Sequence, residues 1–298
     1  MRTSGTVLCL GSAAAFGAMA VIGKLAYDEG ATVGTLLAVR FAIASAVFWA
    51  LVLADGTASE IRALDRRDIG AAVALGACAY AAQAGCYFAA LERIDAALLS
   101  LLVYTSPVIV AVTAIALGRE RFSVRRLTAL ALVSGGLVLV VAGAGTGALD
   151  PLGAALAVAT ALIYSAYILV GERVTARMRP RLLSALVCTG ATVTLTLGSA
   201  LLGQLDPGAL SAAGWAWLAC IAVVSTVAAL GLFFAGLRRV GPTTASILST
   251  VEPLVTAVLA FVVFGEQLTS VQLIGGALVL GAVLALQAVK TDRRVPAT

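Results

Sequence analysis

The sequence contains no histidine and few charged residues. Charged side chains make up 12% of its 298 residues, about half of the share found in soluble domains. Without histidine, the chain lacks the most common metal ligand and the usual proton carrier at neutral pH. The five cysteines form no CxxC pair and all lie within apolar runs. We therefore expect neither a metal site nor a disulfide framework.

The sequence also lacks the motifs of nucleotide hydrolysis and of membrane-embedded proteolysis. It has no G-x-x-x-x-G-K-[ST] loop, no HExxH motif and no cluster of carboxylates in its apolar runs. The chain is therefore not expected to hydrolyse ATP by itself, to act as an enzyme or to carry a cofactor.

The sequence is instead rich in long apolar runs. Hydrophobic residues make up 61% of the chain, and its mean hydropathy is +1.05. A helix needs about 20 apolar residues to cross a bilayer, and ten runs of roughly this length follow one another. They are Val7–Ala26, Val33–Ala54, Ile69–Leu91, Ala96–Leu117, Leu127–Ala142, Pro151–Gly171, Leu182–Gly203, Gly214–Leu237, Thr243–Phe264 and Val271–Val289. We expect the first run to be a retained helix and not a cleaved signal.

The basic residues indicate an orientation and not a nucleic-acid partner. A net charge of +5 would favour nucleic acid in a soluble protein, but here the basic residues lie in short gaps between apolar runs. If the gaps alternate between the two sides, 17 of the 20 basic residues fall on one side and only Arg93 on the other. The basic side of a membrane protein is the cytoplasmic side. This split predicts ten spans with both termini in the cytoplasm.

The second half of the sequence repeats the first. Pro107 and Pro253 lie 146 residues apart, and the same offset pairs Phe88 with Phe234 and Glu120 with Glu266. A repeat of five helices is odd in number, so its second copy must enter the membrane upside down. The predicted fold is an all-α integral membrane protein of ten transmembrane helices. It comprises two inverted five-helix repeats, residues 1–142 and 151–288, and a cytoplasmic tail, residues 289–298.

These residues resemble the EamA-type family of the drug/metabolite transporter superfamily. The resemblance rests on Ser106–Pro107 with Gly118–Arg119–Glu120, on Glu252–Pro253 with Gly265–Glu266, and on the Arg40–Phe41 step. It covers nearly the whole chain. It implies a ten-helix carrier, often an exporter, of amino acids, related metabolites or drug-like cations, with the exporters of aromatic amino acids as the nearest branch.

Charged groups deep in a membrane are costly, so each of them requires an explanation. Glu252 lies near the middle of the ninth run, beside Pro253, and is expected to bind a substrate ammonium or a proton, or to be a structural acid. Arg40 either forms an ion pair with Glu252, the slightly favoured interpretation, or binds a substrate carboxylate through its planar fork of donors. Lys24 lies near a span end, where its long stem is expected to reach the interface.

Uncharged polar residues gather at a similar depth in several spans, and proline is expected to kink two of the helices, at Pro107 and Pro253. Rings, hydroxyls and an amide at this depth suit a zwitterion with a partly apolar side chain, although ordinary contacts between helices would also explain them. The candidate substrate-binding residues are Tyr80, Gln83, Tyr104, Thr105, Tyr164, Tyr167, Thr226 and Thr250, together with Arg40 and Glu252.

Small residues predict where two helices approach each other. Ala131 and Gly135 match Ala277 and Gly281 in spacing, and small residues four apart favour close helix contact in membranes. Glu120 and Glu266 fall beyond span ends and are expected to organise loops.

The sequence predicts a secondary transporter that exports amino acids, aromatic and other neutral ones included, or related small metabolites across the bacterial inner membrane by alternating access. A transporter of drugs, organic cations or sugars is the alternative within the superfamily, and a channel is the alternative from another class. The expected partners are a small-molecule substrate and the lipid bilayer, without nucleic acid, and we expect a monomer.

Overall fold

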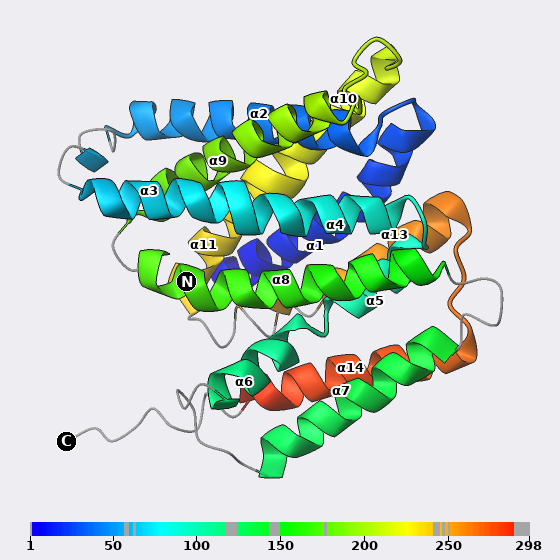
Figure 1. Cartoon of the computed structure of the whole chain (residues 1–298). Coiled ribbons are helices and arrows are strands. Elements are labelled where there is room, and N and C mark those ends of the chain that lie inside the picture. Colours follow the sequence, from blue (N-terminus) through cyan, green and yellow to red (C-terminus); the bar gives the residue numbers. More distant parts are fainter. Residues whose placement is uncertain are drawn as a thin grey trace, which may run out of the picture.

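The computed structural model describes residues 2–56, 60–61, 64–116, 124–142, 150–175, 178–240, 245, 248–249 and 251–288. Its long elements are all helices, and these residues contain no β-strand (Figure 1). The helices are α1 (Arg2–Asp28), α2 (Val33–Ala54), α3 (Arg66–Ala74), η2 (Leu75–Tyr80), α4 (Ala81–Leu91), α5 (Ala96–Val103), α6 (Ser106–Ala116), α7 (Val124–Ala142), α8 (Pro151–Thr175), α9 (Pro180–Leu201), α10 (Ala212–Ala222), η3 (Val223–Ala228), α11 (Ala229–Val240), α13 (Glu252–Phe264) and α14 (Ser270–Ala288). The all-α prediction is confirmed.

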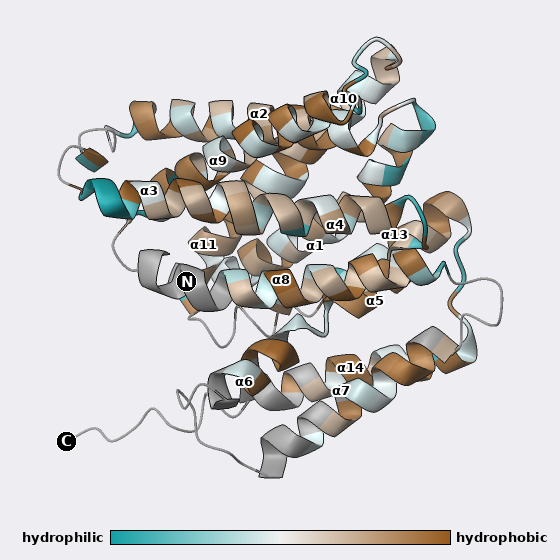
Figure 2. Cartoon of the chain, in the orientation of Figure 1, coloured by the Kyte–Doolittle hydropathy of each residue, from teal (hydrophilic) through white to brown (hydrophobic). Residues whose placement is uncertain are grey.

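Five stretches are long and apolar enough to cross a bilayer. They are Ser4–Asp28, Val33–Ala54, Arg66–Leu91, Pro180–Leu201 and Ala212–Leu237. Shorter apolar helices lie where other spans are predicted, among them Glu252–Phe264 and Pro151–Tyr167. Apolar residues run along the helices, and hydrophilic ones gather near helix ends, such as the start of α3 (Figure 2). The total of ten spans and the side of the termini stay predictions.

Helices from the first half of the chain pack mainly against helices from the second half. The central α1 contacts α10, α11 and α13, while α8 contacts α4, α5 and α6. The helices α2 and α9 lie side by side, and so do α7 and α14 (Figure 1). The two halves therefore build one interleaved bundle.

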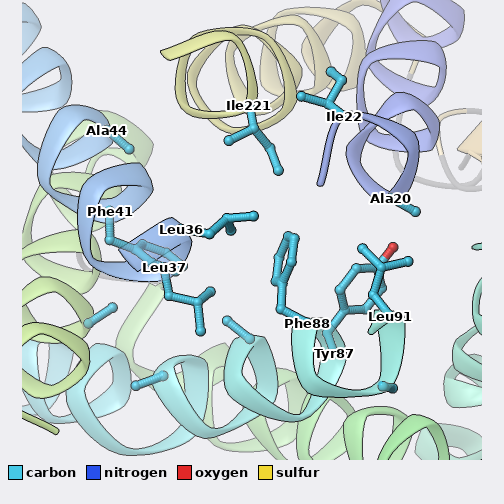
Figure 3. Close-up of a cluster of buried hydrophobic side chains, with 14 of the residues drawn as sticks. Ala20, Ile22, Leu36, Leu37, Phe41, Ala44, Tyr87, Phe88, Leu91 and Ile221 are labelled. Carbon is cyan, nitrogen blue, oxygen red and sulfur yellow. The ribbon is translucent and has the colours of Figure 1, made fainter. Parts of the chain in front are cut away.

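A cluster of buried hydrophobic side chains lies between α1, α2, α4 and α10 (Figure 3). Leu36, Phe41, Phe88 and Ile221 are fully buried there and point toward one another (Figure 3). Packing of this kind resists displacement, because large side chains fill the space between helices at close to crystal density. Arg40, whose guanidinium lies over the rings of Phe41 and Phe88, borders this cluster.

Two helix crossings have room only for glycine. A Cβ on Gly76 of η2 would lie 2.0 Å from the carbonyl oxygen of Val187, and one on Gly190 of α9 would lie 2.1 Å from that of Val73. In the α7–α14 pair, a Cβ on Gly136 or on Gly275 would lie 2.6 Å from the carbonyl oxygen of the other glycine.

The helices α7 and α14 do pack closely, but not through the predicted residues Gly135 and Gly281. Nothing lies within 4 Å of a Cβ built on Gly135 or Gly281. The contact passes through the neighbouring face of each helix, where Gly136 and Gly275 stand. A spacing pattern alone did not distinguish the two faces, because glycines occur on both.

Candidate functional site

Arg40 is a buried cation in the first half of α2. Its side chain is 3% exposed, its Nε donates a hydrogen bond of 2.9 Å to Oγ1 of Thr226, and its guanidinium lies 5.1 Å and 5.3 Å from the ring centres of Phe41 and Phe88. Cations over ring faces are stabilised by the ring quadrupole. The aromatic pair and the hydroxyl thus hold the guanidinium without neutralising it.

The expected ion pair between Arg40 and Glu252 is absent. Among the residues that the structure describes, no carboxylate oxygen lies within ion-pair distance of Arg40. Arg40 instead interacts with η3 through Thr226, whereas Glu252 stands in the first turn of α13. A negative charge is favoured at this end of a helix. The slightly favoured interpretation was wrong because each charge has a different kind of support.

Four aromatic rings form a ladder that starts beside Arg40. Phe41 contacts Tyr80 edge to face at 5.2 Å, Tyr80 stacks on Tyr167 at 5.6 Å, and Tyr167 stacks on Tyr164 at 6.3 Å. The ladder joins α2, η2 and α8. Tyr164, its last ring, is 37% exposed. Three tyrosines predicted from depth alone are therefore brought together, with a partly open ring at one end.

One helix is interrupted at the first predicted proline kink, and another begins at the second. The helix α5 ends at Val103, a turn covers Tyr104 and Thr105, and α6 begins at Ser106. In the other half, α13 begins at Glu252. In both cases proline is the second residue of the new helix, Pro107 in α6 and Pro253 in α13. Proline fits the first turn of a helix, where no backbone N–H is needed.

Glu252 is the first residue of α13, where this helix packs against α1. A Cβ on Gly17 of α1 would lie 2.8 Å from the carbonyl oxygen of Glu252. The first turn of α13 is also fastened to α1, because Thr256 donates a hydrogen bond of 2.9 Å to the carbonyl oxygen of Gly17. Glu252 is therefore a carboxylate at the start of a half-length helix that is held against α1.

The remaining candidates are less integrated. Thr105 donates its hydroxyl proton to the carbonyl oxygen of Leu102, at 2.7 Å, so this hydroxyl closes the turn in its own helix. Gln83 lies on α4 without a hydrogen bond to any residue that the structure describes. Thr250 lies outside the described residues.

Two residues of the site were not predicted. Phe88 supplies a ring face to Arg40, and its carbonyl oxygen accepts a hydrogen bond of 2.9 Å from the hydroxyl of Tyr27. Tyr87, which is buried, contacts the ring of Phe88 edge to face at 5.2 Å. Both residues lie about two helical turns after Tyr80, on the continuous helix that η2 and α4 form. That spacing was the available signal.

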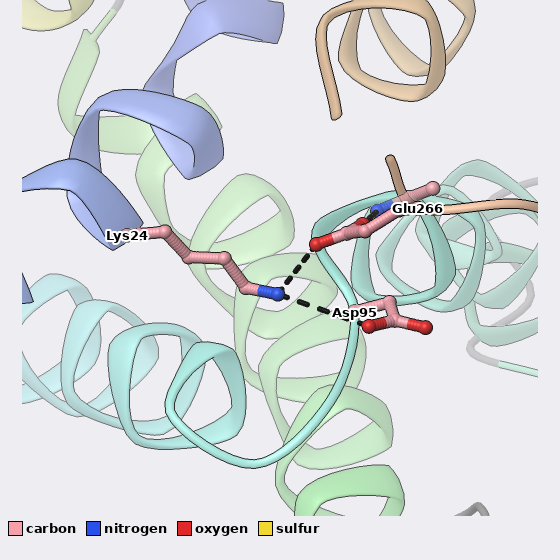
Figure 4. Close-up of polar contacts among 4 residues, drawn as sticks. Lys24, Asp95 and Glu266 are labelled. Atoms are coloured by element: carbon pink, nitrogen blue, oxygen red, sulfur yellow. Dashed lines mark hydrogen bonds and ion pairs between the residues drawn. The ribbon is translucent and has the colours of Figure 1, made fainter. Parts of the chain in front are cut away.

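A second group of charges lies at one end of the bundle, which we call the Lys24 end. Lys24 of α1 forms ion pairs with Glu266 at 2.5 Å and with Asp95 at 3.9 Å (Figure 4). The other oxygen of Glu266 accepts the backbone N–H of Ala97, at 3.2 Å. Lys24 has two acidic partners at this end of the bundle, and its extension to the membrane interface stays a prediction. Glu266 organises the start of α5.

The Lys24 end also holds an exposed ion pair and an open groove. Arg93 donates to Asp150 at 3.0 Å. Asp150 also accepts the backbone N–H groups of Leu152 and Gly153. These hydrogen bonds lower the pKa of Asp150 below its ordinary value, and the hydrogen bond from Arg93 has the largest effect. The groove is lined by Lys24, Tyr27, Asp28, Leu91, Glu92, Arg93, Asp95, Asp150, Phe264 and Glu266.

Comparison with known proteins agrees with this architecture. Residues 3–142 and 151–287 each match the EamA-like transporter family. An uncharacterized transporter of Archaeoglobus fulgidus is 31% identical over 203 residues, which cover 66% of this chain and 69% of the relative. A crystal structure with 20% identity superposes with a TM-score of 0.69 over 99% of this chain and 100% of its own, and so shares the fold.

The chain is therefore a multi-pass membrane transporter of small substrates. It belongs to the EamA-like transporter family. The resemblance to this family is confirmed. It was predicted from Ser106–Pro107 with Gly118–Arg119–Glu120 and from Glu252–Pro253 with Gly265–Glu266.

Proposed function

We propose that this transporter exports amino acids, or closely related small metabolites with a carboxylate, across the bacterial inner membrane by alternating access. The observation that carries the proposal is the buried guanidinium of Arg40, which has no acidic partner among the described residues. An unpaired buried cation is costly. A substrate carboxylate would supply the missing negative charge and would fit the planar fork of arginine.

The rest of the site suits the other parts of an amino acid. Glu252 offers a carboxylate to an ammonium group at the start of α13. The stacked rings of Tyr80, Tyr167 and Tyr164 offer an apolar, aromatic surface to a side chain. Aromatic rings stack favourably with one another, so aromatic and other neutral amino acids are the proposed substrates.

The proposed mechanism uses the two halves of the chain. Helices 1–142 and 151–288 occur in the same order, and each half contains a π-helical segment and a helix that begins with a proline in its first turn. We take them as two inverted five-helix repeats with ten spans and cytoplasmic termini. Inverted repeats provide two near-equivalent packings, one open to each side of the membrane.

An organic cation would use Glu252 and leave Arg40 without a role, and a sugar would use neither charge. A channel would conduct without saturation. These alternatives make different predictions for the same measurement, which is exchange of labelled substrate across the membrane of liposomes that hold the purified protein.

The liposomes are loaded with unlabelled phenylalanine, threonine or a sugar, and uptake of the labelled counterpart is followed. We expect saturable exchange of the amino acids and none of the sugar. Arg40→Gln should abolish this exchange, whereas Arg93→Gln, which removes an exposed arginine, should retain it. Exchange of organic cations alone, with Arg40→Gln still active, would contradict the proposal.

A further inference from the structure

The segment η3 contains a buried hydroxyl group that the structure leaves unused. Ser225 is fully buried, and its Oγ has no hydrogen-bond partner among the described residues. Hydroxyl groups of serine in helices normally donate to a carbonyl oxygen three or four residues earlier. A buried hydroxyl without a partner is unfavourable and requires an explanation.

The explanation lies in the π-helical register. The neighbouring Thr226 donates its hydroxyl proton to the carbonyl oxygen of Ile221, five residues earlier, at 3.2 Å. In an α-helix, the hydroxyl of Ser225, four positions after Ile221, would be the one that reaches this carbonyl oxygen. The wide turn thus gives the carbonyl oxygen of Ile221 to Thr226 and leaves Ser225 unpartnered.

This choice of register affects Arg40 directly. Because the only hydroxyl proton of Thr226 is directed at Ile221, a lone pair of its Oγ1 is left to accept the hydrogen bond from Nε of Arg40. The other π-helical segment, η2, ends at Tyr80, whose ring contacts Phe41. The Arg40–Phe41 step therefore lies between two wide turns, and such turns are frequent at functional sites.

We infer that η3 is a two-state segment in which Ser225 and Thr226 compete for the carbonyl oxygen of Ile221. In the observed state, Thr226 holds this oxygen and positions Arg40. In the second state, the wide turn has moved toward α11, Ser225 holds the oxygen, and Thr226 turns to the next carbonyl group and releases Arg40. Both serve as positioning residues, and neither is required to touch the substrate.

The first test needs no substrate. Hydrogen–deuterium exchange is measured on peptides that cover residues 221–230 of the purified transporter. Ser225→Ala removes the group that favours the second state, so exchange in η3 should slow by roughly tenfold. Ser12→Ala is the matched control. Ser12 is another buried serine, but it donates to the carbonyl oxygen of Ala229 at 2.8 Å, and its loss should accelerate exchange.

The second test rests on the proposed function. In liposomes with labelled phenylalanine, Ser225→Ala should lower the maximal exchange rate several-fold and leave the half-saturating concentration unchanged. Thr226→Val should raise the half-saturating concentration, and Thr226→Ser should restore it.

The inference fails if Ser225→Ala leaves deuterium uptake in η3 unchanged or faster, or if its maximal rate equals that of the wild type. If no variant, wild type included, exchanges phenylalanine, the proposed function fails, and the deuterium measurement still decides whether η3 has two states.

Discussion

The centre of the bundle and its Lys24 end hold charges in opposite ways. At the Lys24 end, Lys24 is paired with Glu266 and Asp95, and Arg93 is paired with Asp150. At the centre, Arg40 is held by rings and a hydroxyl, and no acid described by the structure pairs with it. Paired charges are typical of structural roles. An unpaired buried charge costs stability, which favours a role with a ligand.

This difference predicts opposite signs for the same kind of mutation. Removing a charge at the Lys24 end should weaken the fold. Removing the charge of Arg40 should leave the fold as stable or more stable, and should stop transport. The following predictions use this contrast, from the largest expected effect to the smallest.

Arg40→Met should reduce amino-acid exchange by about a hundredfold, because a substrate carboxylate would lose its charged partner. The thermal stability of the purified variant should equal or exceed that of the wild type, since a buried unpaired cation has been removed. Exchange in liposomes and thermal unfolding in detergent measure the two effects. A marked loss of stability would show that Arg40 is structural and would remove the contrast.

Glu252→Gln should lower exchange by roughly tenfold at saturating substrate, because the amide keeps the shape but loses the charge offered to an ammonium group. Glu92→Gln is the control, since Glu92 is an exposed acid at the Lys24 end. Equal exchange by both variants would remove Glu252 from the mechanism and leave it as a helix-end acid.

The Lys24–Glu266 pair should be coupled by about 1 kcal/mol in a double-mutant cycle of Lys24→Met and Glu266→Gln, because both side chains are partly or largely buried. Unfolding in mixed micelles measures the coupling. The single variants should change stability more than exchange. A coupling near zero would mean that the pair does not stabilise the contact between α1, α5 and α13.

The sequence was sufficient for the helices and insufficient for the pairing of charges. The predicted range of α2 coincides with the observed helix, because Thr32 caps its first turn and apolar residues continue to Ala54. Depth alone also brought Tyr80, Tyr164 and Tyr167 to one site. Depth contains no information on direction around a helix, however, so the partner of Arg40 was assigned to Glu252 and not to Thr226.

The interruptions and wide turns were also beyond prediction. Proline at positions 107 and 253 indicated a kink, but whether a helix bends or restarts depends on its neighbours. The π-helical segments η2 and η3 carry no composition of their own, because they contain the same small and apolar residues as the α-helices around them. Tertiary contacts decide the register there.

The smallest expected effect is on pH dependence at the Lys24 end. The pKa of Asp150 is lowered in the folded protein by Arg93 and by two backbone N–H groups, so the unfolded chain binds this proton more tightly. The contribution of Asp150 to stability is therefore present at neutral pH and is lost as the pH falls below about 4. Asp150→Asn should flatten the loss of thermal stability in this range. An unchanged dependence of stability on acid pH in Asp150→Asn would show that these hydrogen bonds do not stabilise the folded state. The interpretation of Arg40 does not depend on this result.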